Sequence, residues 1–366
     1  MKITSIESFT VKLADTMPDD HRITRLGITR IRTDEGITGY GFQGTDEATL
    51  ANRVRPILIG ANPLDIEQHW HTEALYRVAG VEHALWDIAG KAAGMPVRTL
   101  LGSTRERIPY YLTCVWAGAV DQSHVSIKDQ ADQLVRYYEM GHNRFKIRGW
   151  RPDPLDDVRV LAEVKNQLGD VEGLELMIDR TAHHPGWFWT YEQGLQVARA
   201  MESIGATWLE EPFAREDIES YRRLREEVDI PITGGEFGYE MHHFKEYLAA
   251  GAVDIIQPDG AHSGGIMTCR KVGTIAEAFD VSCILHGTMG PHLAASLQAA
   301  GAIASCRVME VCIVRPPFTP QEMWEPVHRI LKTDSLFTLK DGYIELPKGP
   351  GLGVDIDEEA LEAHRI

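Results

Sequence analysis

The segment ATWLEEPFAREDIESYRRLREEVDIPITGGE, residues 206–236, decides the fold class of this chain. It contains two short apolar runs, ATWLEE and PITGGE, and each run ends in acidic residues. A stretch with helical composition separates the two runs. A strand, a helix and a second strand in this order are typical of a parallel βα unit.

The same unit repeats after Pro109. The short runs are, in chain order, YYLTCVW, RFKIRG, LELMID, ATWLEE, PITGGE, VDIIQPD, VSCILHG and RVMEVCI. Helical patterns lie between them, such as the spacing of Ile127, Ala131 and Leu134. Eight strands with seven helical segments in about 200 residues predict a barrel of βα units. An open doubly wound sheet is the alternative, but no GxGxxG follows the first strand.

The segments on both sides of the barrel are expected to form a second unit. Residues 1–110 are predicted to be an α+β domain, residues 111–330 the barrel, and residues 331–366 a segment that returns to the first domain. Pro316-Pro317 indicates that the eighth barrel helix is missing or altered, and the Gly- and Pro-rich tail from Asp334 is too irregular for barrel strands. The elements expected in the first domain are strands Ile3–Leu13, Ile23–Thr33 and Ile37–Gln43, and helices Asn62–Tyr76 (with Asn62 as N-cap) and Val81–Lys91.

Composition excludes several classes of protein. The chain has 366 residues, of which 43% are hydrophobic and 25% charged, as in an ordinary globular protein. Its net charge of −17 argues against nucleic-acid binding. No apolar stretch reaches the roughly 20 residues that span a bilayer, so no membrane partner is expected. Five cysteines without CxxC spacing argue against disulfides and a thiolate zinc site, and they indicate a cytoplasmic location.

Ionisable residues recur at the predicted strand ends. They are spaced by 23 to 33 residues, about one βα repeat, and comprise Lys146, Asp179, Glu210, Glu236, Asp259, His286 and Glu310. A single carboxylate after a strand is usually a helix N-cap, which is the interpretation we favour for Asp153 and Asp217. Seven repeats with their charge in the same register instead predict one cluster at the carboxyl ends of the strands. In a barrel of this kind, that end is the active site.

Three of these acids form the predicted metal site. Asp179, Glu210 and Glu236 would repel one another strongly if they clustered without neutralisation, and one divalent cation resolves that repulsion. Ligands that are all oxygen favour Mg²⁺, with Mn²⁺ as the second choice. Glu211 ranks behind Glu210, because strand alternation points its side chain the other way.

A different pair is predicted to move protons. Asp259 and His286 come from adjacent units, so the carboxylate can accept from one imidazole nitrogen and leave the other to act as a base. Lys146 and Arg148 occupy alternate positions of one strand and place two cations in the barrel, where they can hold a substrate carboxylate. The weaker candidates are His183, His184, His262 and His292, although both His183 and His184 follow Asp179 closely enough to touch a bound substrate.

Taken together, these motifs resemble the enolase superfamily, specifically its mandelate racemase subgroup. The resemblance spans nearly the whole chain and includes GITRIRTDEGITGYG, ALWDIAGKAAGMPVRTLLG, FKIRG, LMID, WLEEP, ITGGE, IIQPD and DGYIELPKGPGLGVDID. It implies an α+β capping domain on a modified TIM barrel, (β/α)₇β, with one Mg²⁺ per subunit. It also implies that Asp179, Glu210 and Glu236 are the metal ligands, that Lys146, Asp259 and His286 are catalytic, and that Glu310 hydrogen-bonds the substrate carboxylate or enolate.

Two residues depart from the family pattern, and the first of them narrows the predicted reaction. Arg148 stands where a second lysine base is usual, and Thr181 replaces an asparagine. Arginine is a poor general base. Because a racemase needs bases on both faces of the α-carbon, dehydration by His286 outranks racemisation.

The predicted activity is therefore that of a metal-dependent lyase. The substrate would be a sugar acid, an aldonate or aldarate, converted to a 2-keto-3-deoxy acid. We expect Arg148, Thr181, His183 and the cap residues His21 and Arg22 to bind it. A cycloisomerase, a racemase or epimerase, and a catalytically silent sugar-acid-binding protein are the alternatives. The family resemblance also implies a homo-oligomer, from dimer to octamer.

Overall fold

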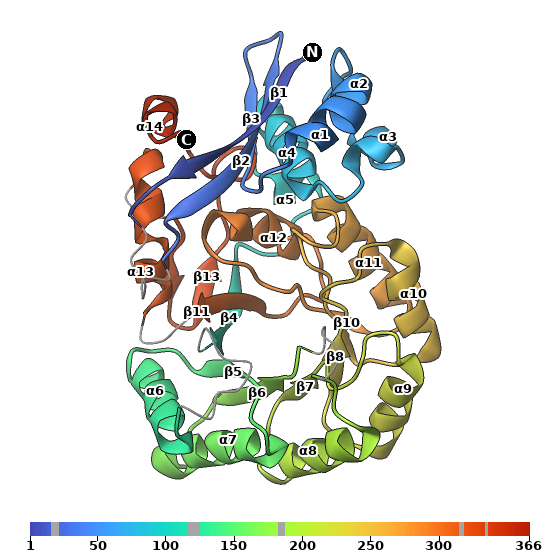
Figure 1. Ribbon diagram of the computed structural model, residues 1–366, viewed down its shortest axis with the longest axis vertical. Helices are drawn as coiled ribbons and strands as arrows, with labels where there is room; N and C mark the ends of the chain where they lie inside the picture. The colour runs from blue at the N-terminus through green and yellow to red at the C-terminus, as the bar shows by residue number, and fades with distance from the viewer. Residues whose placement is uncertain (16–21, 116–124, 182–186, 315–317, 334–335) are drawn as a thin grey trace.

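The structure is a computed structural model, and it describes residues 1–15, 22–115, 125–181, 187–314, 318–333 and 336–366. Its first part is a three-stranded antiparallel sheet with helices packed on it, shown in blue and cyan in Figure 1. The turn between the second and third strands falls at Asp34–Gly36, as predicted, and Gly36 has a positive φ of 80° there. The elements are β1 (Ile3–Lys12), β2 (Arg25–Thr33), β3 (Thr38–Gly41), α1 (Glu47–Thr49), the π-helical turn η1 (Leu50–Val54), α2 (Arg55–Leu58), α3 (Ile66–Trp70), the 3₁₀ turn η2 (Glu73–Leu75), α4 (Ala79–Ala93) and α5 (Val97–Leu100).

The predicted helix from Asn62 to Tyr76 is wrong in its start and in its continuity. Asn62 forms a turn instead: its Oδ1 accepts from the backbone N–H of Leu64 at 3.2 Å. The helix α3 begins only at Ile66 and ends at Trp70. Thr72 then caps η2 by accepting from the backbone N–H of Ala74 at 3.2 Å. Short polar side chains that bond to nearby backbone groups compete with a continuous helix, and they prevail here.

The second part is the predicted βα barrel. Parallel strands neighbour one another in chain order from β4 to β10, and β11 pairs in parallel with β4. Between β10 and β11 the described residues form no ladder, but the backbone N–H of Gly287 donates to Glu310 Oε2 at 2.9 Å, so the two strand ends still meet. The strands are β4 (Arg107–Val115), β5 (Arg144–Arg148), β6 (Glu175–Asp179), β7 (Trp208–Glu210), β8 (Ile232–Gly234), β9 (Ile255–Ile256), β10 (Ser282–Cys283) and β11 (Met309–Val314).

Helices surround these strands on the outside (Figure 1). Asp153 and Asp217 cap two of them, as predicted, by accepting from the backbone N–H of Leu155 and Ser220 respectively. The helices are α6 (Ile127–Glu139), α7 (Pro154–Leu168), α8 (Tyr191–Ser203), α9 (Ile218–Glu227), α10 (Met241–Ala250), α11 (Ile266–Ala278), the turn η3 (Gly290–His292) and α12 (Leu293–Ala300). Between β11 and residue 333 the described residues form no long helix, only the short α13 (Pro320–Trp324) and the 3₁₀ turn η4 (Glu325–Ile330), so the eighth helix is altered, as Pro316-Pro317 indicated.

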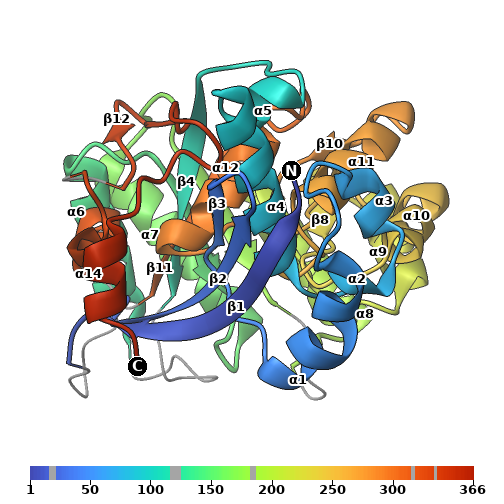
Figure 2. The ribbon, with the colours of Figure 1, turned by 90° about the horizontal axis from the view of Figure 1, so that it is seen from above.

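The C-terminal tail is more regular than predicted. The hairpin β12 (Leu339–Lys340) and β13 (Tyr343–Glu345) extends the sheet, because β13 pairs antiparallel with β4. The rest of the tail returns to the first domain, as predicted. Helix α14 (Glu358–Ala363) precedes a bridge between Arg365 and Val11 of β1, and Figure 2 shows the two segments together.

An apolar layer inside the barrel lies beneath the charged side chains of the site. A small cluster inside the barrel comprises Tyr111, Met177, Trp208, Ile284 and Val308. The last four precede Asp179, Glu210, His286 and Glu310 by two positions, so strand alternation puts both sets on the inward face. The apolar side chains therefore form a floor beneath the charged ones. None of the helices within the described ranges combines the length and the apolar character needed to cross a membrane.

Candidate active site

The charged layer is built on strands held in register. Arg148 of β5 is paired with Asp179 of β6, which is paired in turn with Glu210 of β7. Across the barrel, Asp259 and His286 are joined by a parallel bridge. Adjacent parallel strands thus carry these side chains at one level, at the carboxyl ends of the strands.

Three carboxylates come together in this layer. Three carboxylate oxygens, one each from Asp179, Glu210 and Glu236, lie within 4.8 Å of one another. All three residues are at most 2% exposed. A different cation contacts each of them. Arg148 pairs with Asp179, Lys146 Nζ lies 2.7 Å from Glu210 Oε1, and Arg215 Nη2 lies 3.3 Å from Glu236 Oε1.

The structure offers a direct test of whether these acids suit a cation. Glu236 Oε2 is buried and makes no hydrogen bond within the described part of the chain, and it lies 3.2 Å from His286 Nε2, with which it forms an ion pair when His286 is protonated. The buried acids of the layer are Asp179, Glu210, Glu211, Glu236, Asp259 and Glu310, and the cations among them are Lys146, Arg148, Arg215 and His286 when protonated. Full ionisation leaves two negative charges, which one divalent ion would neutralise. The all-oxygen donor set fits Mg²⁺.

Burial penalises the charged form of two of these acids. It raises the pKa of Glu210 to about 7 and that of Glu236 to about 8. The pKa of Asp179 is lowered instead, because Arg148 and Lys146 outweigh its burial. Without a cation, Glu210 and Glu236 therefore bind protons near neutral pH, and a metal ion would displace them.

His286 and Asp259 form the predicted pair. His286 Nδ1 bonds to Asp259 Oδ2, while His286 Nε2 lies 3.2 Å from Glu236 Oε2 and 3.9 Å from Glu310 Oε2. Burial opposes the imidazolium, but Glu236 and Glu310 outweigh it and raise the pKa of His286 to about 10. The pKa of Asp259 is well below its usual value, because hydrogen bonds from His262 and His286 outweigh its burial. A divalent ion at Glu236 would weaken the field of that carboxylate, and His286 could then be neutral.

Lys146 and Glu310 lie at the centre of the layer. Lys146 Nζ is 2.8 Å from Glu210 Oε2 and 3.0 Å from Glu310 Oε1, and its side chain is fully buried. Burial alone would lower the pKa of Lys146, but Glu210 and Glu310 hold it well above its usual value. The ammonium therefore stays charged, which suits stabilisation of a developing anion better than proton abstraction. Glu310 also accepts from the hydroxyl of Thr113.

The predicted substrate-binding residues are only partly brought together. Arg148 joins the charged layer, and Thr181 lies beside it, with its backbone N–H donating to Asp179 Oδ1 at 2.6 Å and a positive φ of 47°. Arg22 lies in the cap, 3.4 Å from Glu325 after β11. His21 and His183 fall outside the described residues, and so does His184.

The cap fixes the loop that follows Asp259. His83 of α4 is buried, and its Nε2 lies 2.7 Å from the carbonyl oxygen of Gly260. A carbonyl only accepts, so Nε2 carries the proton. Glu82, the preceding residue, accepts from the backbone N–H groups of Ile266 and Met267 at the start of α11. One turn of a cap helix thus holds both ends of this loop.

We expect this contact to make stability sensitive to acid. Burial lowers the pKa of His83 to about 4, below its usual 6.5, so folding stability is lost as the pH falls from 6.5 towards 4. Between pH 7 and pH 4.5 the wild type should lose about 2–3 kcal/mol more than His83→Gln, which keeps a donor for Gly260. Urea unfolding at the two pH values measures this difference. Equal losses in the two proteins would show that His83 is not held neutral.

Three residues of the site were not predicted. Gln257 donates to Glu210 Oε2 at 2.9 Å, and it lies two positions before Asp259, so alternation along VDIIQPD could have identified it. Thr113 could have been found in the same way on β4. Arg215 reaches the site from a loop, and no periodicity marks it.

Comparison with known proteins identifies the family of this chain. A family model described as enolase C-terminal domain-like matches residues 129–360, and one described as mandelate racemase / muconate lactonizing enzyme, N-terminal domain, matches residues 15–102. A D-galactonate dehydratase of Variovorax paradoxus is 32% identical, with the match covering 91% of this chain and 89% of the relative.

Solved structures show the same architecture over the whole chain. D-glucarate dehydratase from Agrobacterium tumefaciens, complexed with magnesium, superposes with a TM-score of 0.84 at 26% identity and covers 100% of this chain and 99% of that one. The 3,6-anhydro-D-galactonate cycloisomerase from Zobellia galactanivorans has a TM-score of 0.77 at 26% identity, with 100% of both chains covered.

Proposed function

Because this chain belongs to the mandelate racemase/muconate lactonizing enzyme family of the enolase superfamily, we propose that it is a metal-dependent dehydratase of a sugar acid. The substrate is an aldonate or an aldarate. The enzyme removes the proton α to the carboxylate and eliminates the β-hydroxyl as water. The enol that results becomes a 2-keto-3-deoxy acid.

The observation that carries this proposal is the His286–Asp259 pair beside the carboxylate trio. Asp259 holds Nδ1, which leaves Nε2 as the nitrogen that faces the trio. Among the described residues of the charged layer, the other side chains that could act as a second base are Lys146 and Arg148. Lys146 is kept charged by Glu210 and Glu310, and arginine does not give up its proton at neutral pH. A single base supports elimination rather than racemisation.

Each residue then has a defined task. His286 Nε2 accepts the α-proton, and the imidazolium delivers that proton to the departing hydroxyl on the same face. Lys146 stabilises the negative charge that develops on the substrate carboxylate. Glu310 would have to take up a proton when substrate binds in order to donate a hydrogen bond to that group. The rest of the substrate is bound by Arg148, Thr181, His183 and the cap residues His21 and Arg22.

We assign the metal to Asp179, Glu210 and Glu236. The ion is Mg²⁺, with Mn²⁺ as a substitute. It supplies positive charge that makes the α-proton more acidic. We also propose that residues 1–110 form the cap, residues 111–330 the barrel and residues 331–366 the tail that returns to the cap. The protein is proposed to form a homo-oligomer, from dimer to octamer.

A panel of acid sugars with Mg²⁺ tests the proposal. D-Galactonate and D-glucarate come first, because similar proteins are named for them. We expect a 2-keto-3-deoxy product from at least one aldonate or aldarate. If the protein bound an acid sugar without Mg²⁺-dependent exchange of its α-proton in D₂O, it would be a silent binding protein instead.

Cycloisomerisation is the second candidate, favoured by the likeness to the Zobellia galactanivorans enzyme. It would use the same base and metal. Adding 3,6-anhydro-D-galactonate to the panel separates the two reactions, because the cycloisomerase keeps all atoms of its substrate in one product whereas the dehydratase releases water.

A further inference from the structure

Arg215 connects Glu211, the residue that follows β7, to Glu236 of the trio. It comes from the loop between β7 and α9. Its Nε donates to Glu211 Oε1 at 2.9 Å, and its Nη2 lies 2.6 Å from Glu211 Oε2 and 3.3 Å from Glu236 Oε1. One planar guanidinium therefore holds two buried carboxylates at once, which a lysine could not do with the same geometry.

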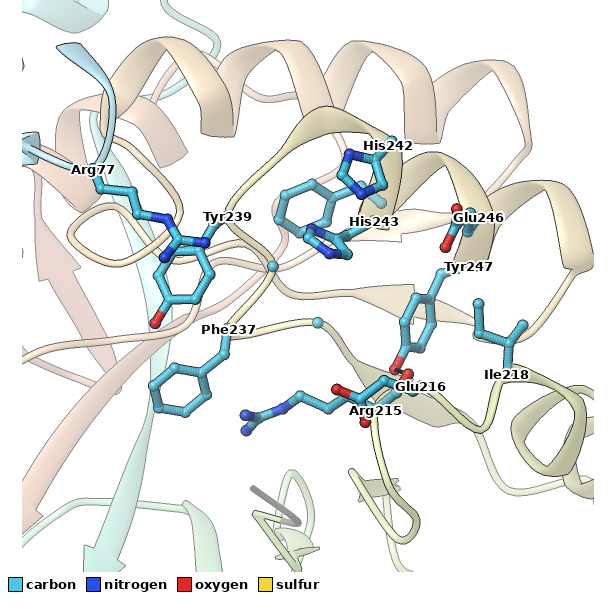
Figure 3. Close-up of a pocket in the computed structure, with 13 residues that line it drawn as sticks. Arg77, Arg215, Glu216, Ile218, Phe237, Tyr239, His242, His243, Glu246 and Tyr247 are labelled. Atoms are coloured by element: carbon cyan, nitrogen blue, oxygen red, sulfur yellow. Dashed lines mark hydrogen bonds between the residues drawn. The ribbon is translucent and has the colours of Figure 1, made fainter. Parts of the chain in front are cut away.

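The arginine is itself fixed in place. Its guanidinium lies 4.1 Å from the ring centre of Phe237, and its carbonyl oxygen accepts from the hydroxyl of Tyr247 at 2.6 Å. Figure 3 shows the side chain of Arg215 directed towards Phe237, at the edge of a pocket of about 590 Å³ that Arg77, His242 and His243 also line. Arg215 thus stands between this pocket and the trio.

The two oxygens of Glu236 have different surroundings as a result. Oε1 is the oxygen that Arg215 holds, whereas Oε2 makes no hydrogen bond within the described ranges and faces His286. Glu211 provides the anchor for Arg215. It has a positive φ of 45°, and its backbone N–H donates to the carbonyl oxygen of Thr233 on β8 at 3.1 Å. An unfavourable backbone conformation of this kind costs about 1–3 kcal/mol and persists only where its surroundings enforce it.

We infer that Arg215 is a positioning residue for the metal site: anchored by Glu211, it orients Glu236 so that Oε2 is presented to the cation. This inference rests on the proposed function, because it assumes that Glu236 is a ligand. The consecutive acids of the WLEEP motif then have separate tasks. Glu210 is a metal ligand, whereas Glu211 holds Arg215, which orients the ligand Glu236.

Electrostatics alone predicts the opposite effect on metal affinity. Removing a cation near the ligands should strengthen metal binding, whereas losing the fixed orientation of Glu236 should weaken it. The double variant Glu211→Gln/Arg215→Gln removes both charges of the pair, so the net charge is unchanged and only the orientation is lost. Loss of an outer hydrogen-bond partner typically costs about 10–100-fold in metal affinity.

Calorimetric titration of the full-length protein with MnCl₂ and with MgCl₂, without substrate, tests the inference. The double variant should bind each ion about 10–100-fold more weakly than the wild type, and Arg215→Lys should lie between them. Arg225→Gln is the matched control, because Arg225 pairs with Asp254 at the opposite, amino-terminal end of the strands. It should bind like the wild type.

Each result is decisive. A folded double variant that binds Mn²⁺ as tightly as the wild type overturns the positioning role and leaves the proposed function intact. If the wild type itself binds neither ion, the metal site and the proposed function fail together. If the double variant does not fold, Arg215→Lys decides, since wild-type affinity in that variant would also overturn the inference.

Discussion

Replacing His286 with asparagine should reduce kcat for dehydration by about 10⁴, the upper end of what a general base contributes. His286 Nε2 is the basic atom beside the carboxylate trio, and no compensating base is expected from Lys146, which Glu210 and Glu310 keep protonated. Exchange of the substrate α-proton in D₂O should disappear together with dehydration. Mg²⁺ binding should persist, because His286 is not one of the three ligands.

Asp259→Asn should reduce kcat for dehydration nearly as much, because of the geometry of the loop that follows Asp259. Asp259 Oδ1 accepts from the backbone N–H groups of Ala261 and His262. An asparagine must therefore keep its oxygen there and present its NH₂ group to His286 Nδ1. Nδ1 would then accept, which puts the proton on Nε2 and removes the base.

His262→Asn is the matched control. His262 Nδ1 also approaches Asp259 Oδ2, at 3.4 Å, but 42% of its side chain is exposed and it has no place in the proposed chemistry. Its kcat should change far less than that of His286→Asn. Continued α-proton exchange at the wild-type rate in His286→Asn would make Lys146 the base and reverse the face of attack.

Removing the divalent ion should abolish activity. The trio and its neighbours retain two negative charges when fully ionised, and Glu236 Oε2 makes no hydrogen bond in the described chain. Glu236→Gln should weaken Mg²⁺ binding more than 100-fold, because even an outer hydrogen-bond partner contributes about 10–100-fold. Calorimetry gives the affinity, and assays after dialysis against EDTA, with Mg²⁺ or Mn²⁺ added back, give the activity.

Glu175→Gln is the control for this experiment. Glu175 lies at the amino end of the same strand that Asp179 ends, and it pairs with Arg144 at 2.7 Å. Its loss should leave Mg²⁺ binding unchanged. Full activity after thorough EDTA treatment would contradict the metal-dependent mechanism, and so would unaltered Mg²⁺ affinity in Glu236→Gln.

The strand-end residues could be predicted because barrel strands have a simple periodicity. Neighbouring parallel strands place their last residues at the same level. Residues that recur once per βα repeat in the sequence are therefore paired across neighbouring strands, as Arg148, Asp179 and Glu210 are. Strand length was less predictable. The runs VDIIQPD and VSCILHG form regular ladders over only two residues each, Ile255–Ile256 and Ser282–Cys283, because their flanks carry turns and functional side chains.

The contacts of loop residues could not be predicted from periodic patterns in the sequence. Arg215 is an ordinary charged residue in FARED, and its role follows from a loop path and from the φ of Glu211, neither of which has a period. The helix predicted from Asn62 failed for a related reason. Its apolar spacing is compatible with one long helix, but local bonds by Asn62 and Thr72 divide it.

The joining of the two chain ends has a consequence for synthesis on the ribosome. The N–H of Lys12 donates to the carbonyl of His364 at 2.8 Å, and the N–H of Ile366 donates to the carbonyl of Thr10 at 3.0 Å. Strand β1 thus receives these partners only after residues 364–366 have been synthesised. Nascent domains commonly fold as they emerge, but here β1 must wait for residues 364–366 while the barrel strands between them can already assemble.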